Sequence, residues 1–289
     1  MKVRTLLAPA LVLGITAAAC ANAPTPGSGS GDGGIVHAGG AGDLLLRISN
    51  EGGFLPPEYT LTATPSLSLL GDGTVVTPGA QTEIYPGPAL PPQVATPITE
   101  EGIQSVLRAA LDAGLDQDRD YTDLGSVGIA DAGTTVFTLT IDGTTHVTRI
   151  YALGELGQQP PGMSDQEFSA RTRLLGFQTS MQDLRHTLPA GSVGDDAMFT
   201  PSGLRLFVSD YRSEQGLPQE AVDWPLATPL SGFGEAATAA GFRCGAVTGA
   251  DLDAVLPLAT RANQLTPWRS GVVNYAIAFR PLLPDESGC

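Results

Sequence analysis

Two short turns of glycine and aspartate, each flanked by β-rich runs, constrain the fold more than any other feature of the sequence. The Gly-Asp-Gly turn at 71–73 lies inside the run 67–76, and the Asp-Gly turn at 142–143 lies inside the run 135–151. Gly and Asp tolerate the positive φ angles that tight turns need. Both runs therefore predict antiparallel hairpins.

A helix is expected after each hairpin. Thr99 is the expected N-cap of a helix that ends at Ala113, before Gly114. Ser164 and Glu167 form a capping box at the start of the other helix. Its buried face is expected to continue through Leu174, Phe177, Met181, Leu184 and Leu188.

The last third of the chain also alternates strands with a helix. Thr248 is the expected cap of a helix over about 249–263, and Pro257 is expected to kink or split it. The expected strands are residues 204–208, 242–247 and 272–279.

Hairpins separated by helices predict an α+β fold with a mainly antiparallel sheet. The body is expected to span 43–289, as two similar hairpin–helix units and a C-terminal unit tied by a disulfide. The expected sub-units are 43–125, 126–200 and 201–289.

The N-terminus predicts export. Residues 1–4 carry Lys and Arg, residues 5–19 form an apolar run that ends in small side chains, and Cys20 follows. A basic segment, a short apolar segment and a small-residue cleavage site are typical of a signal peptide over 1–19. Residues 20–42 are expected to be a flexible Gly/Ser/Pro tether that begins at Cys20.

The sequence Ala-Ala-Ala-Cys at 17–20 resembles the lipobox of bacterial lipoproteins, although Ala17 replaces the usual Leu. The resemblance implies that Cys20 is acylated and holds the protein at a membrane. The alternative is ordinary cleavage after Ala19 and secretion.

Acylation of Cys20 would leave Cys244 and Cys289 as an even pair outside the cytoplasm, where disulfides persist. A bridge between them is therefore expected, with two free thiols as the alternative.

Charge and composition exclude several classes of protein. The formal net charge of −15 excludes a protein that binds nucleic acid through a basic face. The 42% hydrophobic content excludes a disordered chain. The only long apolar run is at the N-terminus, so the sequence predicts no interior membrane span.

An acidic segment over 116–123 resembles the start of a calcium-binding loop, because hard cations need converging oxygens. Tyr121 and Val127 occupy positions where such a loop needs Gly and Glu. The alternatives are a solvated acidic loop and a calcium site; apart from calcium, no cofactor is expected. The candidate ligands are Asp116, Asp118, Asp120 and Asp123.

No residue is assigned a catalytic role. A glycosidase carboxylate pair stays open, because such a pair is defined by its separation in space. Trp224 and Trp268, each beside a proline, are expected to pack at the ends of elements, or alternatively to stack on sugar rings or a peptide.

Two further stretches resemble secreted bacterial proteins. One is the hairpin 70–76 with the helix 99–113, and the other is the ending 279–286 with Cys289. The resemblance implies no activity and no catalytic residue.

These observations predict an extracytoplasmic α+β protein, anchored by lipid, that binds or supports an envelope protein or polymer without catalysis. The alternatives are a carboxylate-based hydrolase of wall or sugar polymers and a calcium-dependent adhesion module.

Overall fold

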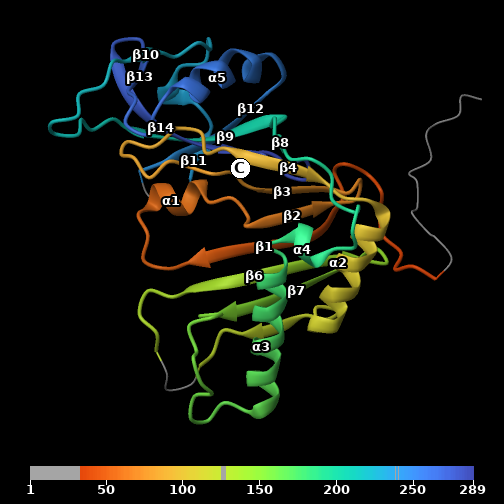
Figure 1. Ribbon diagram of the computed structural model, residues 1–289. Coiled ribbons are helices and arrows are strands. Elements are labelled where there is room, and N and C mark those ends of the chain that lie inside the picture. The colour runs from red at the N-terminus through yellow and green to blue at the C-terminus, as the bar shows by residue number, and fades with distance from the viewer. Residues whose placement is uncertain (1–32, 125–127, 238, 240) are drawn as a thin grey trace, which may run out of the picture.

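The fold is known from a computed structural model that describes residues 33–124, 128–237, 239 and 241–289. The protein is α+β, with two mostly antiparallel sheets (Figure 1). The first sheet has eight strands: β1 (Leu44–Gly52), β2 (Leu67–Leu70), β3 (Thr74–Pro78), β4 (Gln93–Pro97), β5 (Arg119–Tyr121), β6 (Gly133–Ile141), β7 (Thr144–Tyr151) and β8 (Ala197–Met198). Their order across the sheet is β5-β7-β6-β1-β2-β3-β4-β8.

The second sheet comes from the last third of the chain. Its strands are β9 (Gly203–Asp210), β10 (Val222–Asp223), β11 (Glu235–Ala236), β12 (Arg243–Thr248), β13 (Trp268–Ser270) and β14 (Val273–Pro281). Their order is β10-β13-β14-β9-β12-β11. The helices are α1 (Pro57–Thr62), α2 (Glu100–Ala113), α3 (Asp165–Ser180), α4 (Leu184–Thr187), α5 (Gly249–Arg261) and the 3-10 turn η1 (Leu230–Gly232).

Both expected hairpins are confirmed. β2 pairs with β3 around the Gly-Asp-Gly turn, and β6 pairs with β7 around Asp142 and Gly143, whose φ angles are 49° and 70°. Gly73 could not be replaced without displacement, because an added Cβ would lie 2.4 Å from the carbonyl oxygen of Ile98. Both hairpins belong to the first sheet.

The starts of the two long helices are also confirmed. Thr99 Oγ1 accepts from the Gly102 amide at 3.3 Å, and Ser164 Oγ accepts from the Glu167 amide at 3.2 Å. Gly114 ends α2 in the left-handed conformation, with φ of 89°. α2 and α3 lie on one face of the first sheet (Figure 1) and close its core.

The expected continuous helix through Leu188 is wrong. α3 ends at Ser180, and α4 begins after Asp183, whose Oδ1 accepts from the His186 amide at 3.1 Å. The apolar spacing still predicts burial, since Met181 and Leu188 lie in the first core. Local capping by Asp183 interrupts the helix while the buried face continues.

α5 lies close to its expected position, but Pro257 does not split it. The helix runs unbroken from Gly249 to Arg261, with Pro257 inside. Val255 and Ala259 on either side are fully buried in the second core, and this packing offsets the backbone hydrogen bond that proline cannot donate. Thr248 occupies the N-cap position, but its side chain makes no capping hydrogen bond.

The described part of the expected tether is held against the first sheet. Gln104 in α2 exchanges two hydrogen bonds with Ile35, donating to its carbonyl at 2.9 Å and accepting from its amide at 2.8 Å. His37 is 4% exposed and its Nε2 lies 3.2 Å from Glu100 Oε1. Residues 34–42 therefore belong to the folded body, in contrast to the expected free coil.

The segment from Gly52 to Pro56 leaves the first sheet and leads into α1, which no sequence pattern predicted. No helix within the described residues combines the length and the apolar character that crossing a bilayer requires.

Candidate functional sites

Cys20, the expected lipidation site, lies outside the described residues. The other sites expected from the sequence lie inside them, and each can be followed in the structure.

The acidic segment 116–123 runs along the edge of the first sheet, where three of its residues form the short strand β5. Asp118 Oδ1 accepts from the Val147 amide of β7 at 2.8 Å. Asp120 accepts from the Thr122 amide at 2.9 Å and from the Thr122 hydroxyl. These hydrogen bonds, with a smaller contribution from the charge of Arg149, hold the pKa of Asp120 below its ordinary value.

The structure does not gather the four candidate calcium ligands, Asp116, Asp118, Asp120 and Asp123, into an ion site. Among the described residues, no three His, Cys, Asp or Glu side chains are placed to hold a metal ion. The carboxylates of Asp118 and Asp120 cap nearby backbone amides instead.

Trp224 and Trp268 lie inside the second core. Their ring centroids are 6.2 Å apart in an edge-to-face arrangement, and Trp268 packs the same way on Phe279 at 5.2 Å. Trp268 is fully buried, and Trp224 donates from Nε1 to the Thr228 carbonyl at 2.9 Å. This arrangement is packing at the ends of elements, and it leaves no face of Trp268 for a sugar ring.

Cys244 and Cys289 form the expected disulfide, with their Cα atoms 6.0 Å apart. The bond joins β12 in the second sheet to the segment 282–289, which we call the clasp. The C-terminus lies between the two sheets (Figure 1).

Ion pairs connect the clasp to both sheets. Arg47 of β1 donates to Asp285 at 2.8 Å, while Arg280 of β14 binds Glu286 through two hydrogen bonds of 2.6 and 2.8 Å. Arg280 also donates to the carbonyl of Ala63, which follows α1. The clasp is therefore bonded to the first sheet by Arg47 and to the second by Arg280 and the disulfide.

Burial and charge act in opposite directions on Glu286. Burial raises its pKa, but hydrogen bonds and charge from Arg280, the Leu283 amide and the charge of Arg47 outweigh burial. The net result is a pKa below the ordinary value, so at neutral pH Glu286 is ionised in its ion pair with Arg280.

Sequence reasoning did not single out the clasp ion pairs. A signal was present, because Arg47 interrupts an apolar strand and Asp285 and Glu286 lie close to Cys289. Charged residues are rarely buried without partners, yet their pairing across 238 positions has no local pattern.

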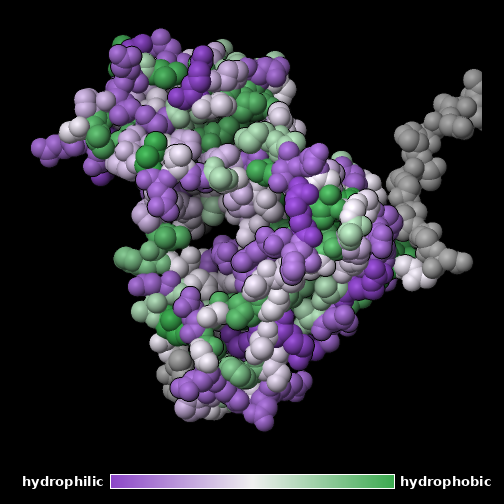
Figure 2. Space-filling model, viewed as in Figure 1, coloured by the Kyte–Doolittle hydropathy of each residue, from purple (hydrophilic) through white to green (hydrophobic). Residues whose placement is uncertain are grey.

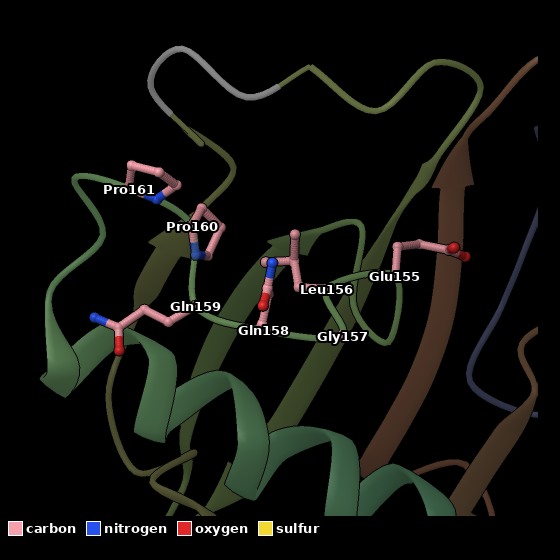
Figure 3. A pocket seen from close by; sticks show the side chains of 7 residues that line it. All are labelled: Glu155, Leu156, Gly157, Gln158, Gln159, Pro160 and Pro161. Carbon is pink, nitrogen blue, oxygen red and sulfur yellow. The ribbon is translucent and has the colours of Figure 1, made fainter.

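Two of the pockets in the described part of the chain bear on a catalytic site. One, of about 530 Å³, is lined by the single loop 155–161 between β7 and α3 (Figure 3). The other, of about 520 Å³, lies between α5 and residues 218–222. Each pocket has one carboxylate in its lining, Glu155 and Glu220 respectively, whereas a glycosidase site needs a pair.

Comparisons with protein families, curated proteins and solved structures find no match to this chain.

Proposed function

We propose that this protein is an extracytoplasmic module, anchored by lipid on Cys20, that binds or supports an envelope component without catalysis. The observation that carries the proposal is the disulfide between Cys244 and Cys289. Disulfides persist outside the reducing cytoplasm, and this one closes the clasp that joins the two sheets.

The lipobox-like sequence before Cys20 supports the anchor. Several acyl chains on one residue give firm attachment, since each buried CH₂ contributes about 0.8 kcal/mol. In the described part of the chain, Gly34, Ile35 and His37 already lie against α2. The proposed anchor therefore lies within a short length of chain from a body with two connected sheets.

The anchor is tested by Cys20→Ser in cells that make the full chain. We expect the wild-type protein to take up labelled fatty acid and to sediment with membranes, and the variant to lose both properties. Cys289→Ser is the matched control, because it removes a cysteine of the clasp and should keep the label. Unchanged labelling and fractionation of Cys20→Ser would refute lipid anchoring.

The absence of catalysis is a separate part of the proposal. Purified protein incubated with wall and sugar polymers is expected to release no soluble fragments. Detectable turnover that survives repeated purification would overturn this part and favour the carboxylate-based hydrolase.

A further inference from the structure

The connection between β1 and α1 exposes three large apolar side chains close together in the sequence. Phe54 is 86% exposed, Leu55 61% and Tyr59 53%. Every residue from 51 to 60 is exposed, and α1 buries none of its side chains. Figure 2 shows hydrophobic residues projecting at the left edge of the molecule, where β1 leads into α1.

The local backbone holds these side chains away from the core. Gly52 and Gly53 have φ angles of 72° and 84°, which turn the chain out of the first sheet. Pro56 and Pro57 then restrict the backbone, and Pro57 begins α1. The exposure is therefore a consequence of the chain's own turn chemistry. Clustered exposed apolar residues mark interaction surfaces more often than single ones do.

Acidic residues lie within and beside this apolar segment. Glu58 lies between Leu55 and Tyr59, and the backbone of Asp131 lies against Gly53, where an added Cβ would be 3.5 Å from its carbonyl oxygen. Glu155 extends from the neighbouring loop toward β1 (Figure 3).

These three carboxylates are exposed and have no ion-pair partner in the described part of the chain, in contrast to Glu51, whose Oε2 lies 2.5 Å from Arg149 Nη1. The surface thus combines three exposed apolar side chains with three acidic residues, which we call its rim.

We propose that residues 51–60, with Asp131 and Glu155 at the rim, are the docking surface for a cationic apolar segment of another protein. This inference rests on the proposed function and names the chemistry of the partner. Charge complementarity selects this occupant. In a symmetric contact between two copies, the like-charged rims would face each other, and an anionic lipid surface would also be repelled.

The contact is small, because Phe54, Leu55 and Tyr59 are its only large apolar side chains. Interfaces of this size are typical of weak, transient complexes. The aromatic residues supply most of the area, and the carboxylates determine which partner approaches. We therefore expect micromolar affinity that decreases as salt screens the rim.

The test uses the full chain with Cys20→Ser, so that no lipid is attached. The probe is a fluorescent amphipathic helical peptide with Leu on one face and Lys on the other. Its counterpart has Glu in place of every Lys. We expect the Lys peptide to bind in the micromolar range and the Glu peptide to bind at least 10-fold more weakly, measured by fluorescence anisotropy.

Variants locate the binding. Phe54→Ser combined with Leu55→Ser should weaken binding of the Lys peptide at least 10-fold, and Glu58→Lys several-fold. The matched controls are Val272→Ser, at a fully exposed valine beside the β13–β14 turn, and Asp253→Lys on α5. Both controls should bind as the parent does, and melting curves should show that all variants remain folded.

Three results would overturn the proposal. The first is equal binding of the Lys and Glu peptides, or of the parent and the Phe54/Leu55 variant. The second is concentration-dependent dimerisation that the Phe54/Leu55 variant abolishes, which would assign the surface to a second copy. The third is binding to vesicles of anionic lipid that the same variant abolishes.

Failure here is distinguishable from failure of the proposed function. The peptide test contains no acyl chain and no polymer, so it is independent of whether Cys20 is lipidated and of whether the protein turns over a polymer.

Discussion

The two sheets are stabilised in different ways. The first sheet combines adjacent hairpins, β2–β3 and β6–β7, with the distant pairing of β1 with β6, and its core is mainly aliphatic. The second pairs β9 with both β12 and β14, and its core centres on four aromatic rings. The disulfide also ties β12 of the second sheet to the clasp. The second sheet is therefore expected to depend more on a few large aromatic side chains and on the covalent clasp.

The largest test of this difference is Trp268→Ala. We expect it to lower the free energy of unfolding by about 4 kcal/mol, because it empties a fully buried ring site in contact with Trp224 and Phe279. Phe137→Ala, also fully buried but in the first core, is the matched comparison.

Hydrogen exchange measures where each change acts. Trp268→Ala should accelerate exchange in β9 and β14 more than in β1 and β6, and Phe137→Ala should do the reverse. Equal acceleration of both sheets by each variant would mean that they open as one unit.

Removing the disulfide should have an effect of similar size. The Cys244→Ser/Cys289→Ser variant loses a cross-link between positions 45 residues apart, which corresponds to about 4 kcal/mol by loop-closure entropy. The clasp is bonded to β12 by the disulfide and to Arg280 of β14 by Glu286. We therefore expect the amides of β12 and β14 to be the first to lose protection from hydrogen exchange. The denaturant midpoint gives the loss in unfolding free energy. A loss below one-quarter of the value expected from loop closure would show that noncovalent contacts alone hold the clasp.

Glu286 tests the electrostatic part of the clasp. Glu286→Gln should cost about 3 kcal/mol at pH 7, because it removes the partner of Arg280 from a largely buried pair. The pKa of Glu286 is lowered from its ordinary value of 4.5, so the folded state holds the proton less tightly than the unfolded state does. Its contribution is complete above pH 4.5 and is lost as the pH falls through the lower, folded-state pKa.

Denaturant unfolding from pH 7 down to pH 3 measures this effect. The difference in stability between wild type and Glu286→Gln should narrow below pH 4.5. A difference in stability that stays constant across this pH range would contradict the conclusion that Glu286 is ionised in its ion pair with Arg280.

The contrast between the sheets also explains what the sequence could predict. Turn glycines, Thr99 and Ser164 act on residues within a few positions, so the hairpins and the starts of α2 and α3 could be predicted. The interruption at Asp183 could not, because the apolar spacing through Met181 to Leu188 is the same for one helix and for two segments that share a buried face.

The same distinction between local signals and tertiary placement applies to the candidate sites. Cysteine parity predicted the Cys244–Cys289 bond, since it needs only a count and a compartment. The pairing of Arg47 with Asp285 depends on how the sheets meet, and the exposure of Phe54 depends on the direction in which Gly52 and Gly53 turn the chain. Neither property follows from periodicity, because both are set by tertiary placement.

The smallest expected effect is a difference between the N-caps of two helices, one packed on each sheet. Thr99→Ala should cost about 1 kcal/mol, because its hydroxyl accepts from the Gly102 amide at the start of α2. Thr248→Ala should cost only a few tenths, because the exposed Thr248 side chain makes no capping hydrogen bond at α5. Denaturant midpoints of the two variants provide the measurement. Equal losses would mean that Thr248 caps α5 in solution, and that the second sheet relies on local helix signals as much as the first does.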